Sequence, residues 1–110
     1  MLGLAWSVEL KESVLDDFRW FGKKNGRQLL KAALERLEDD PLTEARQVKP
    51  LRPNPIADRE LRLFGRYRVL FRVDAPARVV TIVLVGEKRG EALLVQGREY
   101  TEHHETDSSE

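Results

Sequence analysis

Apolar residues in the first forty positions change from alternating to helical spacing. Residues 4–10 alternate between apolar and polar types and predict a first strand. From there the apolar positions recur every three or four residues, which predicts a helix over about 10–23. A second such stripe predicts a helix over 26–39, opened by a capping box at Asn25 and Gln28. Two helices joined so closely are expected to form an antiparallel hairpin.

The pattern becomes that of β strands beyond residue 57. Four prolines within residues 41–57 predict an ordered connection without regular structure. Turns are expected at Gly65 and at residues 74–77, and Gly86 is expected to end the strand before it. The first three strands after the connection should form an antiparallel meander. The expected strands cover residues 60–64, 67–73, 78–85 and 92–95.

The predicted fold is therefore α+β in the order β-α-α-β-β-β, with the helical hairpin on one face of a small, mainly antiparallel sheet. Within residues 67–73 the odd positions are apolar, whereas the even positions include Arg68 and Arg72. The helices need an apolar face to cover, so we expect the odd positions beneath them. The opposite face would then gather basic residues around one aromatic ring: Arg62, Phe64, Arg68 and Arg72.

Charge is distributed unevenly along the chain. The 110 residues include 19 basic and 19 acidic side chains, so the net charge is zero. Residues 46–90, however, hold 11 Lys and Arg against 4 Asp and Glu, a block of +7 that we expect to be uncompensated on its own face. Residues 1–45 carry −2 and residues 91–110 carry −5. Such a basic block could bind phosphates, bind an acidic protein or simply be a solvated surface.

Several classes of function are disfavoured by the composition. The chain has no cysteine, which excludes disulfides, thiolate zinc sites and cysteine nucleophiles. Ser7 and Ser13 have no histidine partner in the expected folded region, so a hydrolase triad is excluded. The longest apolar run, residues 79–85, is too short to cross a bilayer, and the N-terminus lacks a basic leader region. We expect a cytoplasmic protein without a membrane partner.

The length predicts one domain, over residues 1–100, followed by an acidic tail over residues 101–110. From Tyr100 onward the chain is expected to be disordered. The pair His103-His104 lies in this tail and is interpreted as solvated rather than as a metal site.

The predicted β hairpin resembles that of a known protein family. Residues 60–73 read ELRLFGRYRVLFRV, which is similar to the "LR-x-G-x-YRV-x-Y-x-V" hairpin of the RelE/ParE toxins of bacterial type II toxin–antitoxin systems. Residues 85–90, VGEKRG, resemble that family's "V-G-x-[KR]-R" strand end. The resemblance spans roughly residues 5–100 and implies a small α+β toxin that an acidic antitoxin neutralises.

The resemblance implies two alternative activities. RelE-like members cut messenger RNA in the ribosomal decoding site: the ribose 2′-OH attacks the adjacent phosphate, and neither a metal nor another cofactor is needed. ParE-like members instead bind and block DNA gyrase. The leading prediction is a toxin that acts as a ribosome-associated mRNA endoribonuclease and inhibits translation. The alternatives are a non-enzymatic toxin that binds gyrase or another protein, and an inactive binding module.

The resemblance also assigns site residues. Arg68 matches the arginine after the family's tyrosine and is expected to hold the scissile phosphate. Lys88, or Arg89 one position on, matches the basic strand end and could stabilise the charge of the transition state. RNA-binding roles are predicted on other grounds for four further basic residues: strand parity places Arg62 and Arg72 on the basic face, and Lys49 and Arg52 in the proline-rich connection could contact the RNA backbone or simply be solvated.

Two positions depart from the pattern of the RNA-cutting members. Where those members place lysine, this chain has Glu60, and where they place a C-terminal tyrosine, ungapped counting reaches Leu94. Tyr100 is the only tyrosine downstream. An arginine is a poor general base because it stays protonated. The sequence therefore shows residues that could bind a phosphate but does not identify those that would move protons.

Overall fold

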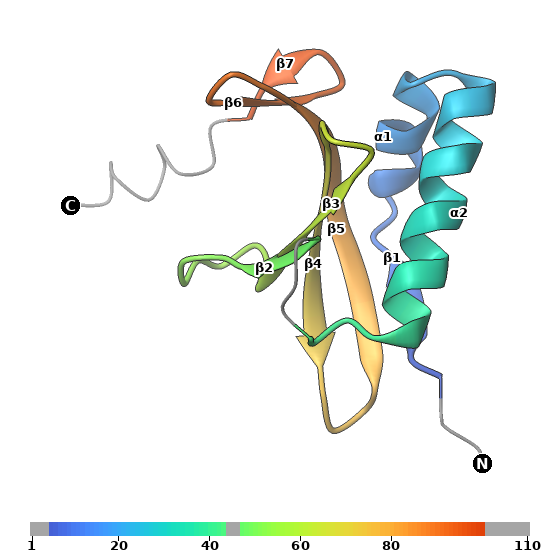
Figure 1. The fold of residues 1–110 in the computed structure, drawn as a ribbon, viewed down its shortest axis with the longest axis vertical. Helices are drawn as coiled ribbons and strands as arrows, with labels where there is room; N and C mark the ends of the chain where they lie inside the picture. The colour runs from blue at the N-terminus through green and yellow to red at the C-terminus, as the bar shows by residue number, and fades with distance from the viewer. Residues whose placement is uncertain (1–4, 44–46, 101–110) are drawn as a thin grey trace.

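The protein consists of a helical layer packed against one face of a twisted sheet, as the computed structural model shows for residues 5–43 and 47–100. Figure 1 shows α1 (Val14–Trp20) and α2 (Lys23–Asp39) side by side on that face. The predicted α+β class, with a helical hairpin on one sheet face, is confirmed. The strands are β1 (Ser7–Leu10), β2 (Val48–Pro50), β3 (Arg59–Leu63), β4 (Tyr67–Asp74), β5 (Val79–Arg89), β6 (Ala92–Val95) and β7 (Arg98–Glu99).

Helix α2 ends at Asp39 as predicted, but its start and both ends of α1 differ from the prediction. Leu10 belongs to β1, so α1 starts later and is shorter than the apolar spacing indicated. The predicted capping box is wrong: α2 begins at Lys23, which places Asn25 in its first turn. Gly22 precedes α2 with a φ of +92°, and no side chain caps the helix. A backbone conformation that glycine adopts easily therefore reverses the chain between the helices.

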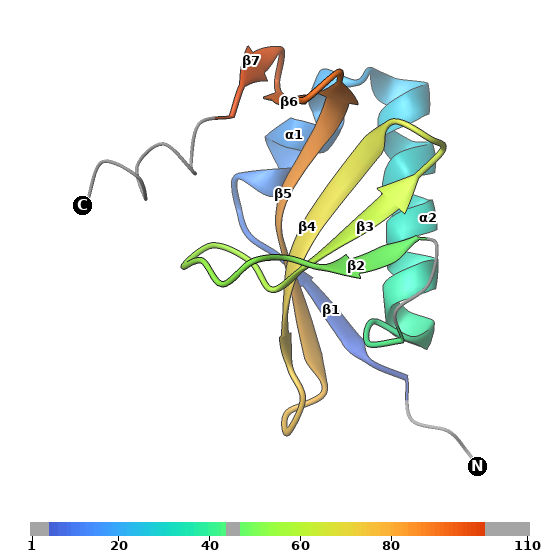
Figure 2. The same ribbon diagram turned by 60° about the vertical axis from the view of Figure 1, so that its left-hand side comes forward.

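The sheet is built around the meander of β3, β4 and β5, which are antiparallel as predicted. β2 extends it at one edge, and at the other edge the long strand β5 has two partners. Its first half pairs in parallel with β1, and its last residues pair with β6. Figure 2 shows β1 and β6 at opposite ends of β5. The short strands β2 and β7 were not predicted, because two or three residues carry too little pattern.

Gly86 does not end the third predicted strand, so that prediction is wrong. It lies inside β5, is buried, and pairs with Arg68. A Cβ atom at this position would lie 2.6 Å from the carbonyl oxygen of Leu94. Glycine is therefore needed here because β6 folds closely over β5.

The odd-numbered apolar residues of β4 point towards the helices, on the sheet face that the alternation predicted. Val69 and Phe71 are fully buried beneath the helices, together with Leu61 of β3. On the other face Leu70 joins a smaller apolar cluster with Ala57 and partly buried residues of the 51–56 loop. The arginines of β4 share this second face, which is open in Figure 2.

Phe64 does not join the basic face, contrary to the prediction. It follows β3 in the turn, with a φ of +51°, and its side chain is 64% exposed. There it lines a hollow on the side of α2, beside Ala32 and Arg36. The positive φ breaks the alternation that held along β3, because the turn redirects the side chain.

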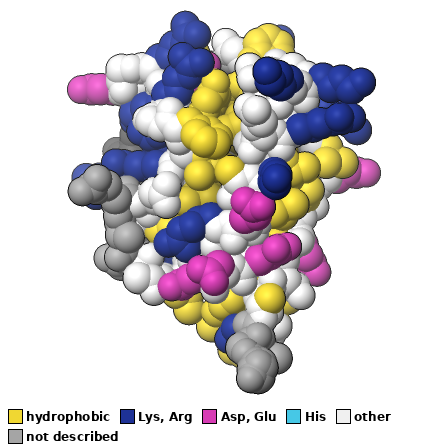
Figure 3. Space-filling model, turned by 45° about the vertical axis from the view of Figure 1, so that its right-hand side comes forward, with side chains coloured by type: hydrophobic (Ala, Val, Ile, Leu, Met, Phe, Trp, Pro, Cys, Tyr) yellow, Lys and Arg dark blue, Asp and Glu magenta, His cyan; other side chains and the backbone are white. Residues whose placement is uncertain are grey.

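The outer surface of the helical layer carries an apolar groove between α1 and α2. Leu15, Phe18 and Leu30 line it, and Arg19 and Lys23 border it. Figure 3 views the molecule from this side and shows a hydrophobic stripe with Lys and Arg side chains around its upper part. Among the described residues, no helix is both long enough and apolar enough to span a membrane.

Replacing Gly26 with alanine is expected to destabilise the protein. A Cβ there would lie 2.3 Å from the backbone oxygen of Phe18, where α1 crosses α2, and a backbone atom cannot rotate away. The overpacking should cost about 1–3 kcal/mol of unfolding free energy, against a gain of roughly 1 kcal/mol in helix propensity. Urea denaturation would measure this, with Asn25→Ala as the matched control, since Asn25 is exposed one residue earlier. Equal stability of both variants would contradict the close helix crossing.

Candidate active site

A pocket of about 450 Å³ opens on the sheet face away from the helices. Its walls come from the 51–56 loop, from β3 and β4, and from the end of β5 with the β6–β7 hairpin. Leu70 and Leu93 supply apolar surface. Its polar side chains are Arg52, Asn54, Glu60, Arg68, Lys88, Glu91, Glu99 and Tyr100. The pocket therefore gathers cationic, carboxylate and phenolic groups in one place.

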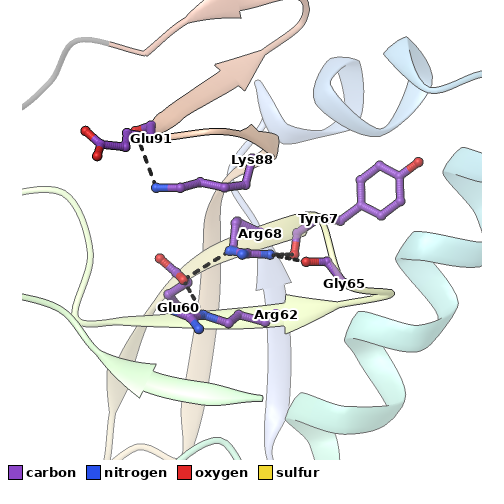
Figure 4. A network of polar contacts seen from close by, with 7 residues as sticks. All are labelled: Glu60, Arg62, Gly65, Tyr67, Arg68, Lys88 and Glu91. Carbon is purple, nitrogen blue, oxygen red and sulfur yellow. Dashed lines mark hydrogen bonds and ion pairs between the residues drawn. The ribbon is translucent and has the colours of Figure 1, made fainter. Parts of the chain in front are cut away.

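Arg68 is the most firmly held cation of this pocket. Its Nη1 donates hydrogen bonds to the carbonyl oxygens of Gly65 at 3.2 Å and Tyr67 at 3.1 Å. Its Nε lies 3.3 Å from Oε2 of Glu60, and the side chain is only 12% exposed. Figure 4 shows these contacts converging on the guanidinium. Among the described residues, these contacts use Nε and Nη1, which leaves Nη2 as the donor group for a ligand.

Glu60 lies among the arginines of the open face. Its Oε2 accepts a hydrogen bond from Nε of Arg62 at 3.0 Å and also contacts Arg68. Arg62 and Arg68 are cross-strand neighbours in β3 and β4, so one carboxylate reaches both. Glu87 similarly lies 3.4 Å from Arg66 and 3.6 Å from Arg89. These two carboxylates are already counted in the net +7 of residues 46–90, so they orient four arginines of the block without changing its net charge, and the expectation that this charge is uncompensated stays a prediction.

Lys88 and Arg89 were alternatives for one role, and the structure separates them. Lys88 lines the pocket, and its Nζ donates to the carbonyl oxygen of Glu91 at 3.4 Å. Arg89 does not line the pocket; its side chain is 68% exposed and pairs with Glu87. Successive residues of a strand face opposite ways, so only one of the two can point into the pocket.

The structure separates Leu94, which ungapped counting reached, from Tyr100, the tyrosine downstream. Leu94 pairs with Glu87 in the sheet and does not line the pocket, whereas Tyr100 does. The backbone N–H of Tyr100 donates to the carbonyl oxygen of Leu93 at 2.7 Å, which fixes the chain there. The prediction that disorder begins at Tyr100 is therefore wrong for this residue. The rest of the predicted tail, residues 101–110 with His103-His104, lies outside the described residues.

Solved structures similar to this one are toxins and toxin–antitoxin complexes. No family model matches the sequence, and no curated protein matches it significantly. A mutant of the E. coli toxin RelE in the free state is 30% identical, with a TM-score of 0.57 over 76% of this chain and 83% of that chain. The chain belongs to the RelE family of toxins.

Two complexes support the same fold. The intact E. coli RelBE toxin–antitoxin complex is 29% identical over 77% of this chain and 99% of that chain, with a TM-score of 0.57. The RelBE2 complex from Mycobacterium tuberculosis is 24% identical over 79% and 95%, with a TM-score of 0.66. The family resemblance predicted from the hairpin residues is confirmed.

The β6–β7 hairpin of this RelE-family chain is anchored to the helical layer. Gln96 and Gly97 form its turn with φ values of +52° and +79°, as a two-residue type I′ turn requires. Nε2 of Gln96 donates to Oδ1 of Asp17 in α1 at 2.7 Å, and a Cβ on Gly97 would lie 2.7 Å from the ring of Trp20. These contacts hold the hairpin that carries Tyr100 to the pocket.

Asp17 is buried at this anchor and is 4% exposed. Its Oδ2 accepts the backbone N–H of Val85 at 3.1 Å. Burial raises the pKa of Asp17 above its ordinary value of 3.8, although the hydrogen bonds from Gln96 and Val85 oppose the rise. The folded protein therefore binds this proton more tightly than the unfolded chain does. Its contribution to stability is full below pH 3.8 and declines as the pH rises through the folded-state pKa.

Replacing Asp17 with asparagine is expected to remove this pH dependence. The amide can still accept the N–H of Val85 and, if the Gln96 amide turns over, donate to its oxygen. We expect the unfolding free energy of the native chain, measured by urea denaturation relative to Asp17→Asn, to fall as the pH rises from about 3.5 towards neutral. If the difference in unfolding free energy between the native chain and Asp17→Asn stays constant or grows with pH, ionisation of Asp17 does not destabilise the folded protein.

The other predicted RNA-binding residues are divided between the pocket and its surroundings. Arg52 lines the pocket in the 51–56 loop. Lys49 on β2, Arg62 on β3 and Arg72 on β4 are exposed and do not line it. Among the described residues, no three His, Cys, Asp or Glu side chains are grouped so that they could hold a metal ion.

Proposed function

We propose that this chain is the toxin of a type II toxin–antitoxin system and cuts messenger RNA on the ribosome. The observation that carries the proposal is the pocket itself, where Arg68 and Lys88 lie beside Tyr100 on a RelE fold. Cleavage through the 2′-OH requires cationic groups at the phosphate and groups that transfer protons. The pocket offers both kinds of side chain.

The cationic half of the proposed chemistry belongs to Arg68 and Lys88. Arg68 presents a guanidinium already oriented by Gly65, Tyr67 and Glu60, so little side-chain entropy is lost when a phosphate binds. Hydrogen bonds from an arginine to a phosphate are charge-assisted and directional. Lys88 enters from β5 and would stabilise the additional negative charge that develops on the phosphoryl oxygens.

The leaving group in this reaction is the 5′-oxygen of the next nucleotide, which must gain a proton. Tyr100 is a suitable donor, because a phenol remains protonated at neutral pH. Its backbone is fixed by the bond to Leu93, and its hairpin by Asp17 and Trp20. A donor held on an anchored element loses little free energy to positioning when the substrate binds.

An antitoxin is the protein partner that we propose, since two of the similar structures are complexes with antitoxins. Acidic side chains of the antitoxin could contact Arg62, Arg68 or Lys88 and compete with RNA for them. Such charge pairs guide the approach of two proteins and favour the correct partner.

The proposal is tested with the purified chain, ribosomes programmed with a defined mRNA, and primer extension to locate new RNA ends. We expect cleavage of ribosome-bound mRNA, no inhibition of gyrase in a supercoiling assay run beside it, and growth arrest when the chain is expressed without its antitoxin. Intact mRNA together with inhibited gyrase would overturn the proposal in favour of a ParE-like activity.

A further inference from the structure

We propose that Glu60 is the general base, the group that removes the proton from the attacking 2′-OH. The inference rests on the proposed RNA cleavage and names a residue for the step that the cationic groups cannot perform. At the position closest to the family's lysine, this chain has a carboxylate that contacts Arg68.

The position of Glu60 in the sheet directs its side chain into the pocket. It lies in β3, between Lys49 of β2 and Leu70 of β4, on the face opposite the core residue Leu61. Its side chain is 18% exposed, and its carboxylate is held by the arginines on that face. Figure 4 shows Glu60 below the Lys88 side chain and beside Arg68.

Glu60 is also next to the expected place of the scissile phosphate. Its Oε2 lies 3.3 Å from Nε of Arg68, and Nη2 of Arg68 shares one edge of the guanidinium with that Nε. A phosphate held by Nη2 would therefore be a neighbour of the Glu60 carboxylate. The 2′-OH that attacks this phosphate belongs to the adjoining ribose, so it would come within reach of a carboxylate oxygen. Geometry of this kind is the first requirement of a general base.

The other polar side chains of the pocket are less suited to accept a proton. Arginine, lysine and tyrosine side chains are ordinarily protonated at neutral pH, whereas carboxylates are ordinarily ionised. Two more carboxylates line the pocket in the described part of the chain, those of Glu91 and Glu99, and both residues are exposed. Of the three, only Glu60 has a contact with Arg68 in that part of the chain.

The proposed step is balanced without a cofactor. Glu60 takes the 2′-OH proton as the bond from O2′ to phosphorus forms. The bond from phosphorus to O5′ breaks, and O5′ takes a proton from Tyr100. The products are a 2′,3′-cyclic phosphate on the upstream fragment and a 5′-OH on the downstream fragment. Glu60 then releases its proton to the solvent, and Tyr100 takes up a proton from the solvent.

The test compares the full chain with Glu60→Gln on ribosomes programmed with the same mRNA, under single-turnover conditions. The amide keeps the shape of the side chain and loses its basicity. We expect the cleavage rate to fall on the order of 10²–10⁴-fold, and affinity for the programmed ribosome to stay equal or rise, since a negative charge is removed. Asp16→Asn is the matched control, because Asp16 is also paired with an arginine but lies on α1.

A second substrate distinguishes the general base, Glu60, from the general acid, Tyr100. When sulfur replaces the bridging 5′-oxygen, the leaving group needs no proton, so the substrate should restore cleavage by Tyr100→Phe but not by Glu60→Gln. Cleavage by Glu60→Gln at the native rate, its rescue by sulfur, or a defect explained wholly by weaker binding would overturn the role of Glu60. If the native chain does not cut mRNA at all, the proposed function is wrong, and the role of Glu60 as general base is wrong with it.

Discussion

Arg68→Ala is expected to lower the rate of mRNA cleavage on the order of 10²–10³-fold, the loss typical when one donor to a transition-state anion is removed. Arg68 is the pocket cation with the most fixed geometry, held by two carbonyl oxygens and by Glu60. The fold should persist, because the side chain lies on the open face and the adjoining core residue Val69 is untouched. Single-turnover cleavage on programmed ribosomes would measure the effect, and thermal unfolding would verify the fold.

Two variants make this result specific. Arg72→Ala removes the same charge from the same strand, but Arg72 does not line the pocket, so it should reduce cleavage only severalfold. Arg68→Lys keeps the charge and loses the planar fork, and should recover little activity, because lysine cannot orient a phosphate as arginine does. A folded Arg68→Ala variant with native cleavage would remove Arg68 from the mechanism.

Tyr100→Phe is the second large effect that we expect. If the hydroxyl protonates the leaving oxygen, its loss should slow cleavage on the order of 10²–10⁴-fold, the usual contribution of a general acid. Binding should change little, because the ring remains. The matched control is Tyr67→Phe, the only other tyrosine of the chain. Tyr67 packs edge-on against Phe21 of the helical layer, with ring centres 5.2 Å apart, and should leave cleavage unchanged. Equal rates for the two variants would exclude Tyr100 as the acid.

The architecture was largely predictable from the sequence because its signals are periodic. Alternation in β4 put Val69 and Phe71 beneath the helices and Arg68 on the other face, and the structure agrees. Boundaries that depend on single backbone conformations were not predictable. Gly86 resembled a strand breaker, yet it permits a close approach of two strands, a tertiary fact that no local pattern contains.

Apart from Arg52, which was predicted from its basic charge in the loop before β3, site residues were predictable where they match a motif. Arg68 and Lys88 were found in this way, and both line the pocket. Tyr100 was missed because the β6–β7 hairpin is too short to show alternation, although the Gln96-Gly97 pair is a weak turn signal. Glu60 was recognised only as a departure from the family. Its contact with Arg68 depends on cross-strand register, which the sequence does not state.

The most direct test of the central claim uses an mRNA with a single 2′-deoxynucleotide immediately upstream of the scissile phosphate, presented on the ribosome beside the all-ribose form. The proposed reaction requires that 2′-OH as its nucleophile. We predict cleavage of the all-ribose mRNA, leaving a 2′,3′-cyclic phosphate end, and no cleavage at that site in the deoxy form. Equal cleavage of both mRNAs would show that water or another nucleophile attacks the phosphate, and would contradict the account.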